Sequence, residues 1–226
     1  MNPKFKLFTV IAILVIFTLA CNAPIGKSTQ SPNPTPEALS FTPSPESINN
    51  SSGIDFGKAA LSITDLPEGF EQLSEEDLAN LGITKEELAT AFEGKLSKAT
   101  PQAFSAFINY TSFEVVVSMI LAPLTTLEKV SFDLYLSNSN KAAKDFSSGA
   151  GANTSVISDF GKIGNSSVAV TFTTGAKPNI LRGDVAISRR GSAGVISMVF
   201  YPDGSTPPVD LLTIAQIMDG KVEELQ

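Results

Sequence analysis

The stretch RGDVAISRRGSAGVISMVFY, residues 182–201, decides the fold. In its first half Val185 and Ile187 alternate with smaller or polar residues, and its last part, residues 195–201, is rich in β-branched and aromatic residues. Alternation with a period of two is typical of a half-buried strand, and glycines between two such runs indicate a turn. The stretch therefore predicts a β-hairpin whose turn is Gly191-Ser192-Ala193-Gly194.

Three other runs predict strands of the same sheet: residues 103–110, 113–121 and 166–173. In the last of these, Val168, Val170 and Phe172 share one face. The run 113–121 (FEVVVSMIL) is instead apolar on both faces, so we expect it to lie in the interior of the sheet.

Helices are predicted between these strands and after them. Capping sequences and closing glycines indicate two short acidic helices over residues 74–82 and 84–94, and apolar spacing indicates helices over 125–136, 140–147 and 207–220. We expect the apolar residues at helical spacing to form the inward faces. They are Leu78, Leu81, Leu88, Phe92, Leu127, Val130, Leu134, Ala142, Phe146, Leu211, Ile214, Ala215 and Met218. The segment Gly149-Ala150-Gly151 is predicted to be a turn.

Together these patterns predict one α+β domain over residues 57–226, in which helices pack against an antiparallel sheet. With 42% hydrophobic residues the chain can bury a core of that size.

The first 20 residues differ in character from this domain. Residues 1–6 carry two lysines and no acid, and residues 7–20 are apolar apart from Thr9 and Thr18. This pattern is typical of an export signal, and the apolar run is shorter than the roughly 20 residues that a permanent membrane-spanning helix needs.

The only cysteine of the chain, Cys21, follows this leader directly. The run Thr18-Leu19-Ala20-Cys21 resembles the lipobox of bacterial lipoproteins, although the lipobox usually has an aliphatic residue where Thr18 stands. The resemblance implies cleavage before Cys21 and a diacylglyceryl thioether on its sulfur, which would anchor the chain at the outer face of the plasma membrane or in the periplasm. Two alternatives remain: an uncleaved amino-terminal anchor, and a secreted protein cut after Ala20.

Residues 21–56 are predicted to be a disordered tether. The segment holds six prolines and few apolar residues, so it cannot bury enough surface to offset the entropy lost on ordering. A flexible chain of this length spans about 30 Å, and polyproline geometry extends it to roughly 90 Å.

The composition excludes much chemistry. The net charge of −7 argues against nucleic-acid binding, and the absence of histidine removes the most common general base and metal ligand. Cys21 lies outside the predicted domain, and no nucleotide-binding loop, serine-lysine motif or calcium loop occurs. We therefore expect no cofactor, no metal site and no enzyme activity, and only a hydrolase that uses carboxylates alone stays open.

The candidate binding residues of the domain are three arginines. Arg189 and Arg190 lie at the turn end of the predicted hairpin, and Arg182 lies near the opposite end of the same strand. In an acidic protein they could bind an anion or an acidic partner surface. The alternative is that they keep the end of a strand soluble and discourage edge pairing.

Residues 163–219, with their IGNSSVAVTF run, hairpin, VISMVFY strand and closing LLTIAQIMD helix, resemble the end of small extracytoplasmic lipoprotein domains. The layout is similar to that of PsbP-like accessory proteins, which implies an antiparallel sheet with helices against it and no particular functional residues. We therefore expect a non-catalytic accessory or binding module of the cell envelope that contacts another envelope protein. A carrier of an apolar small molecule or lipid is the alternative.

Overall fold

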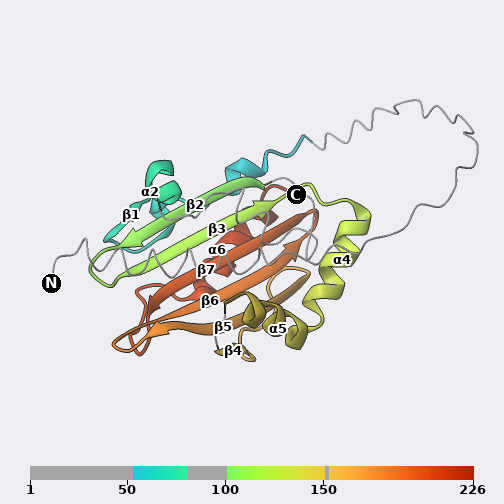
Figure 1. The fold of residues 1–226 in the computed structure, drawn as a ribbon. Helices are drawn as coiled ribbons and strands as arrows, with labels where there is room; N and C mark the ends of the chain where they lie inside the picture. Colours follow the sequence, from blue (N-terminus) through green and yellow to red (C-terminus); the bar gives the residue numbers. More distant parts are fainter. Residues whose placement is uncertain (1–52, 81–100, 151–152) are drawn as a thin grey trace, which may run out of the picture.

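The computed structural model describes residues 53–80, 101–150 and 153–226 (Figure 1). Its strands form one seven-stranded antiparallel sheet in the order β1-β2-β3-β7-β6-β5-β4. The strands are β1 (Phe70–Gln72), β2 (Pro101–Asn109), β3 (Glu114–Leu121), β4 (Asn153–Val156), β5 (Ser166–Ala176), β6 (Asn179–Arg190) and β7 (Ala193–Pro202). The helices are α2 (Glu75–Asn80), α4 (Thr126–Leu136), α5 (Ser139–Ala150) and α6 (Leu211–Glu223), with short 3-10 turns η1 (Phe56–Ala59) and η2 (Ile63–Asp65). The predicted α+β fold is confirmed.

Strands β6 and β7 form the predicted hairpin, with a tighter turn than expected. Arg190 pairs with Ala193, so only Gly191 and Ser192 form the turn, whereas Ala193 and Gly194 belong to β7. Gly191 has a φ of 53°, in the left-handed region that residues with a Cβ rarely adopt. A two-residue turn of this kind matches the twist of the paired strands and fixes their register.

Strand β3 lies inside the sheet, as its two apolar faces predict. It pairs with β2 on one side and with β7 on the other, and Val115 lies opposite Phe200. All eight of its residues are buried. The strand therefore joins two hairpins, β2–β3 and β6–β7, that are far apart in the sequence.

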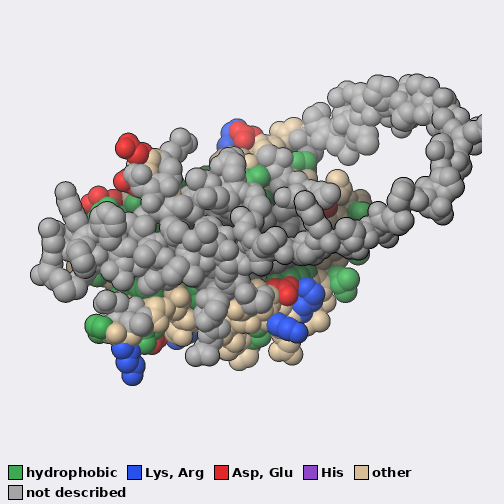
Figure 2. Space-filling view, viewed as in Figure 1, with side chains coloured by type: hydrophobic (Ala, Val, Ile, Leu, Met, Phe, Trp, Pro, Cys, Tyr) green, Lys and Arg blue, Asp and Glu red, His purple; other side chains and the backbone are tan. Residues whose placement is uncertain are grey.

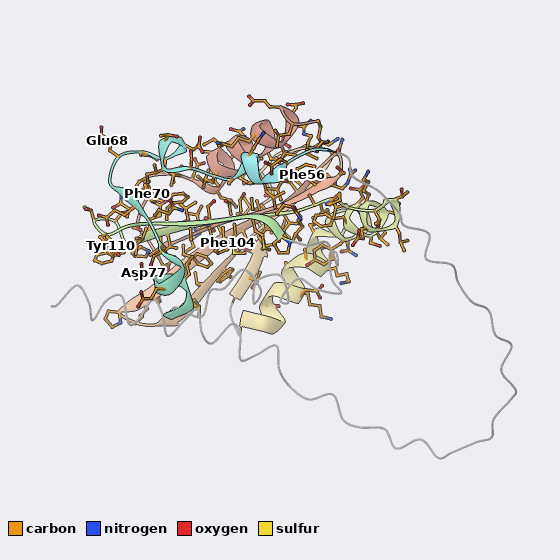
Figure 3. The ribbon with its side chains drawn as sticks, turned by 90° about the horizontal axis from the view of Figure 1, so that it is seen from above. Phe56, Glu68, Phe70, Asp77, Phe104 and Tyr110 are labelled. Carbon is orange, nitrogen blue, oxygen red and sulfur yellow. The ribbon has the colours of Figure 1, made fainter. Side chains whose placement is uncertain are left out.

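Helices cover both faces of this sheet. Seen from above in Figure 3, α6 and η1 lie on one side of the strands, and α4 and α5 lie on the other. The core layer on the α4 side includes Val117, Met119, Ile187, Ile196 and Phe132. The layer on the α6 side includes Phe107, Val116, Ile120, Ile214 and Met218. Each layer is a contiguous cluster of buried side chains, so both faces of the sheet pack against helices.

Helix α4 forms where it was predicted but turns a different face inward. Thr125 and Glu128 form a reciprocal capping box at its start. The buried residues are Phe132, Tyr135 and Leu136, whereas the predicted inward residues Leu127, Val130 and Leu134 are 75%, 60% and 72% exposed. The segment therefore contains two sets of apolar residues at helical spacing. The set that was predicted to face inward is exposed, and the other set is buried.

A close approach between backbone and ring explains the orientation of α4. A Cβ built on Gly194 of β7 would lie 2.5 Å from Cζ of Phe132, so the ring rests directly on the glycine. Only a glycine allows the ring to come this close to the strand. Phe132 is fully buried there, and the opposite side of the helix consequently faces away from the sheet.

The ends of the other helices differ from the predicted bounds. The terminal helix α6 begins at Leu211 instead of Pro207, because the side chain of Asp210 accepts a hydrogen bond from the backbone N–H of Thr213 and caps the helix. The buried stripe on α6 is confirmed. At the end of α5, Gly149 and Ala150 are helical and not part of a turn.

Some predictions can be compared only in part. Leu78 on α2 is buried as expected. The predicted helix over residues 84–94, with Leu88 and Phe92, lies outside the described residues, as do Leu81 and Gly151. The side chain of Phe146 is also outside the description. The short edge strands β1 and β4 were not predicted, since three or four residues give too little periodicity to recognise.

The contact between Gly194 and Phe132 predicts opposite effects for two Gly→Ala substitutions. Gly194→Ala forces a methyl group into the Phe132 ring and should lower the free energy of unfolding by about 1 to 3 kcal/mol, the usual cost of overpacking. Gly220→Ala, within the second half of α6 and with nothing within 4 Å of the added Cβ, should raise it by about 0.5 to 1 kcal/mol. Urea denaturation of both variants measures this, and equal effects would contradict the packing described.

Candidate functional site

The three predicted arginines do not form one site. Arg189 and Arg190 are neighbours at the end of β6, so the alternation of side chains along a strand directs them to opposite faces of the sheet. Arg182 lies toward the other end of β6, opposite Tyr201 of β7. On the face drawn in Figure 2, basic and acidic side chains are scattered among the described atoms instead of gathering into one basic patch.

Arg189 holds helix α4 against the sheet. Its Nε and Nη2 atoms donate to the two carboxylate oxygens of Asp133, both at 2.7 Å, and Nη1 donates to the carbonyl oxygen of Gly191 at 2.9 Å. Ser166 of β5 also donates to Asp133. The hydrogen bond from Arg189 is the main reason that the pKa of Asp133 lies below its ordinary value. This is a bidentate, charge-assisted pair, the strong geometry for arginine and carboxylate.

Arg190 holds helix α6 against the other face in the same way. Its Nε donates to Oδ1 of Asp219 at 2.8 Å, its Nη2 contacts Oδ2 of the same residue, and its Nη1 lies 3.0 Å from Glu223. The hydrogen bond to Asp219 raises the pKa of Arg190. Asp219 also accepts from the backbone N–H of Gly164, at 3.3 Å, so it joins α6 to the segment before β5 as well.

Arg182 is paired within its own strand. Its Nε donates to Asp184 at 3.1 Å, and its guanidinium carbon lies 6.0 Å from the centre of the Tyr201 ring. Each of the three guanidinium groups therefore has a carboxylate partner within the domain. An anion or partner contact at these residues stays a prediction, and the geometry gives them a role in holding the fold together.

The α6 side of the sheet carries a row of buried polar residues that the sequence analysis missed. They lie at the end of the sheet opposite the β6–β7 turn, on neighbouring strands: Asn109 on β2, Glu114 on β3, Tyr201 on β7 and Asp184 on β6. The hydroxyl of Tyr201 donates to Oδ2 of Asp184 at 2.7 Å. Burial and this acceptor raise the pKa of Tyr201. The phenol therefore stays protonated and keeps its hydrogen bond.

Glu114 is the unusual member of this row. Its side chain is 0% exposed, and neither carboxylate oxygen has a hydrogen-bond partner with regular geometry among the described atoms. Burial raises its pKa to about 7, and the nearby backbone N–H of Val209 offsets only part of that effect. The one signal in the sequence is an acidic residue at the start of an otherwise apolar strand, FEVVVSMIL.

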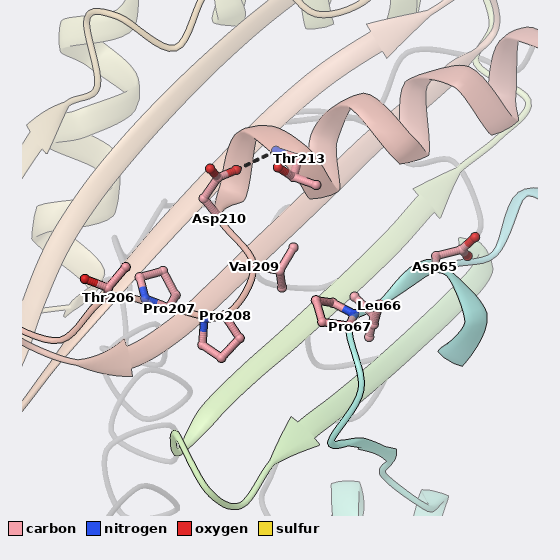
Figure 4. A pocket seen from close by; sticks show the side chains of 9 residues that line it. All are labelled: Asp65, Leu66, Pro67, Thr206, Pro207, Pro208, Val209, Asp210 and Thr213. Carbon is pink, nitrogen blue, oxygen red and sulfur yellow. Dashed lines mark hydrogen bonds between the residues drawn. The ribbon is translucent and has the colours of Figure 1, made fainter.

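A surface cavity of about 500 Å³ lies close to this end of the sheet (Figure 4). One wall is the connection between η2 and β1, and the other is the connection between β7 and α6. Its lining consists of Asp65, Leu66, Pro67, Thr206, Pro207, Pro208, Val209, Asp210 and Thr213. Val209 links the cavity to Glu114 beneath it, although Glu114 itself does not line the cavity.

The two acidic residues of the cavity already have structural partners. Asp65 lies 2.9 Å from Nζ of Lys221 on α6 and accepts from Ser62, at 2.7 Å. Burial would raise the pKa of Asp65, but the hydrogen bonds from Lys221 and Ser62 outweigh it and the pKa is lowered. Asp210 caps α6 through the N–H of Thr213. Their charges are therefore used to join and end structural elements.

Other predicted features can be placed only partly. Among the described residues, no group of three or more histidine, cysteine or acidic side chains has the arrangement of a metal site. Within the same ranges, no helix is both long and apolar enough to cross a membrane. Cys21 lies outside the described part of the chain. Comparison with protein-family models, curated proteins and solved structures finds no match for this chain.

The arginine pairs predict unequal effects at the two carboxylates that Arg190 contacts. Asp219→Ala removes the bidentate partner, which is 13% exposed, and should lower the free energy of unfolding by about 2 kcal/mol. Glu223→Ala removes a partner that is 64% exposed, and should cost less than about 1 kcal/mol. Chemical denaturation at neutral pH measures both values. Similar losses in the two variants would show that α6 is not held through Asp219.

The buried Glu114 predicts a specific dependence of stability on pH. The folded protein keeps this proton up to a pKa of about 7, whereas the ordinary pKa of a glutamate is 4.5, so the contribution of Glu114 to stability is greatest below pH 4.5 and is lost as pH rises through 7. The loss from this group amounts to about 3 kcal/mol in total. Glu114→Gln cannot ionise, and its free energy of unfolding should change far less between pH 5 and pH 8.

A matched variant and a separate pH range keep this test specific. Glu71→Gln on β1 changes an exposed acid, and it should keep the pH dependence of the wild-type protein. The lowered pKa values of Asp65 and Asp133 matter only in more acidic solution, where stability falls as these groups take up protons. A wild-type slope between pH 5 and pH 8 in Glu114→Gln would show that Glu114 is ionised in the folded protein.

Proposed function

We propose that this chain is a membrane-anchored extracytoplasmic lipoprotein, held by lipid on Cys21, whose domain is a non-catalytic accessory or binding module of the cell envelope. The apolar leader and the lone cysteine directly after it support the anchor. The proline-rich segment supports a domain joined to its anchor by a long tether.

One observation carries the non-catalytic part of the proposal: the ionisable side chains that could do chemistry are engaged in holding the domain together. Arg182, Arg189 and Arg190 are each paired with a carboxylate, and Asp65 and Asp210 join or cap structural elements. A general acid or base has to be within reach of a substrate. Glu114, which has the pKa best suited to that work, is fully buried.

A carboxylate-based hydrolase is therefore the least favoured function. Such an enzyme needs two acidic side chains in one accessible cleft, flanking the bond to be cut. The cavity contains Asp65 and Asp210, but its lining includes no aromatic residue on which a sugar ring could stack. The buried pair on the same sheet face, Glu114 and Asp184, does not line the cavity.

A carrier of an apolar ligand is also less favoured. A carrier of this fold would enclose its ligand between the sheet and its helices, in a mostly apolar space. Here large side chains such as Phe107, Phe132 and Met119 fill the layers between sheet and helices and are almost fully buried. The cavity described above lies at the surface, and four of its nine lining residues are acidic or carry hydroxyl groups.

The anchor is tested by following a radiolabelled acyl chain in the producing bacterium. The wild-type protein should take up labelled palmitate and sediment with membranes, because Cys21 carries the only thiol in the chain. Cys21→Ser should take up none, whereas Ser31→Ala, a change of similar size in the predicted tether, should be labelled normally.

The two alternative addresses give different outcomes. Unlabelled wild-type protein in the soluble fraction would contradict the anchor and support a secreted protein cut after Ala20. Unlabelled wild-type protein that stays with the membrane and keeps its leader would contradict it in favour of an amino-terminal membrane anchor.

A further inference from the structure

The outward face of helix α4 is an exposed apolar stripe. Leu127, Val130 and Leu134 follow one another at intervals of three and four residues, so they lie on one side of the helix. They are 60 to 75% exposed, whereas most leucine and valine side chains in the described strands are buried. Large exposed apolar residues that are contiguous, unlike single ones, mark interaction surfaces.

The helix that carries this stripe is firmly held. Its first turn is closed by the capping box of Thr125 and Glu128, its inner side rests on the sheet through Phe132, and Arg189 fixes Asp133 by two hydrogen bonds. The stripe therefore has a fixed orientation relative to the sheet. It is a preformed surface that needs no ordering before it makes a contact.

The exposed residues beside the stripe carry no unpaired charge, and the other charged residues of α4, Glu128 and Lys129, lie away from it by helical periodicity. Its exposed neighbours Thr126 and Ser131 are uncharged, and the acidic Asp133 is neutralised by Arg189. Moving an unpaired charge out of water is costly, whereas moving apolar side chains is favourable. The stripe can thus enter an apolar medium without burying a lone ion.

The place where the preceding chain joins the domain puts the anchoring bilayer within reach of the stripe. A Cβ on Gly57 in η1 would lie 3.7 Å from the carbonyl oxygen of Gln102 at the start of β2. At that end of the sheet Pro101 pairs with Leu121, Leu121 pairs with Gly194, and Gly194 meets Phe132 of α4. The point of attachment and α4 therefore lie at the same end of the sheet, with Tyr110 at the other end (Figure 3).

We propose that the stripe of Leu127, Val130 and Leu134 rests on the phospholipid surface to which the chain is anchored and orients the domain there. This inference depends on the proposed lipid anchor. Three apolar side chains give only a weak membrane contact, which would be negligible for a free protein. For a tethered domain the anchor keeps the local concentration of lipid high, so a weak contact suffices.

The composition of the chain allows a direct test, because it contains one cysteine and no tryptophan. The chain from Cys21 onward retains every described residue and can be coupled through its thiol to a maleimide lipid in phosphatidylcholine vesicles. Leu134→Trp then places a single tryptophan in the stripe, and its emission is read by excitation at a wavelength that tyrosine does not absorb. Tyr110→Trp is the matched control, since Tyr110 is 45% exposed at the far end of the sheet. Circular dichroism checks that both variants are folded.

Contact with the bilayer predicts a difference between the two probes. On vesicles, Leu134→Trp should emit at shorter wavelength than in solution, and bromine atoms on the acyl chains should quench it at least about twofold more than Tyr110→Trp. Adding Leu127→Glu to Leu134→Trp should abolish most of this difference, because it puts a charge on the stripe. Equal, weak quenching of the two probes would overturn the proposal.

The test separates this inference from the proposed anchor. Chemical coupling supplies the membrane whether or not cells acylate Cys21, so weak quenching counts against the stripe alone, and failed palmitate labelling counts against the anchor alone. A shift of Leu134→Trp emission that appears without vesicles and grows with protein concentration would also overturn the proposal. It would show that a second copy of the chain covers the stripe.

Discussion

Two consecutive arginines at the end of β6 hold the three layers of the domain together. Because neighbouring side chains in a strand point to opposite faces, Arg189 reaches α4 on one side and Arg190 reaches α6 on the other. Each forms a bidentate pair with an aspartate on its helix, and the pairs lie close to the turn that sets the register of the hairpin. Arg189 and Arg190, two neighbouring residues of one strand, thus hold helices on both faces of the sheet.

The opposite end of the sheet is organised differently. There the α6 side of the sheet carries buried polar groups, including the acids Asp184 and Glu114. Asp184 accepts hydrogen bonds from Arg182 and Tyr201. Glu114 has no hydrogen bond of regular geometry among the described residues, and a buried carboxyl group of this kind is a cost that the fold has to offset elsewhere. Above it lies the connection from β7 to α6, with adjacent prolines at Pro207 and Pro208. The end of the sheet near the β6–β7 turn is therefore joined to its helices by ion pairs. The opposite end contains Glu114, whose pKa is about 7.

The sequence allowed the local elements to be predicted better than the contacts between them. Alternation marked β5 and β6, β-branched and aromatic residues marked β7, and apolar residues on both faces placed β3 inside the sheet, because these signals depend on nearby residues. The inward face of α4 was predicted wrongly, since Leu127 and Phe132 belong to two apolar sets with the same spacing. What selects between them is Gly194, more than 60 residues away in the sequence, and no local pattern reports such a contact. Asp133 and Asp219, the partners of Arg189 and Arg190, escaped prediction for the same reason, since each is far from its arginine in the sequence.

The pairing of β3 with β7 has a consequence for how the chain reaches its native state. The β2–β3 and β6–β7 hairpins are local and can form rapidly, but β3 and β7 meet only after a long loop closes, which is slow in proteins with many non-local contacts. During synthesis from the amino terminus, β3 emerges with both faces apolar and one edge unpaired until β7 follows. An apolar strand with an unpaired edge is prone to aggregate, so the interval before β3 and β7 pair is the vulnerable stage of folding.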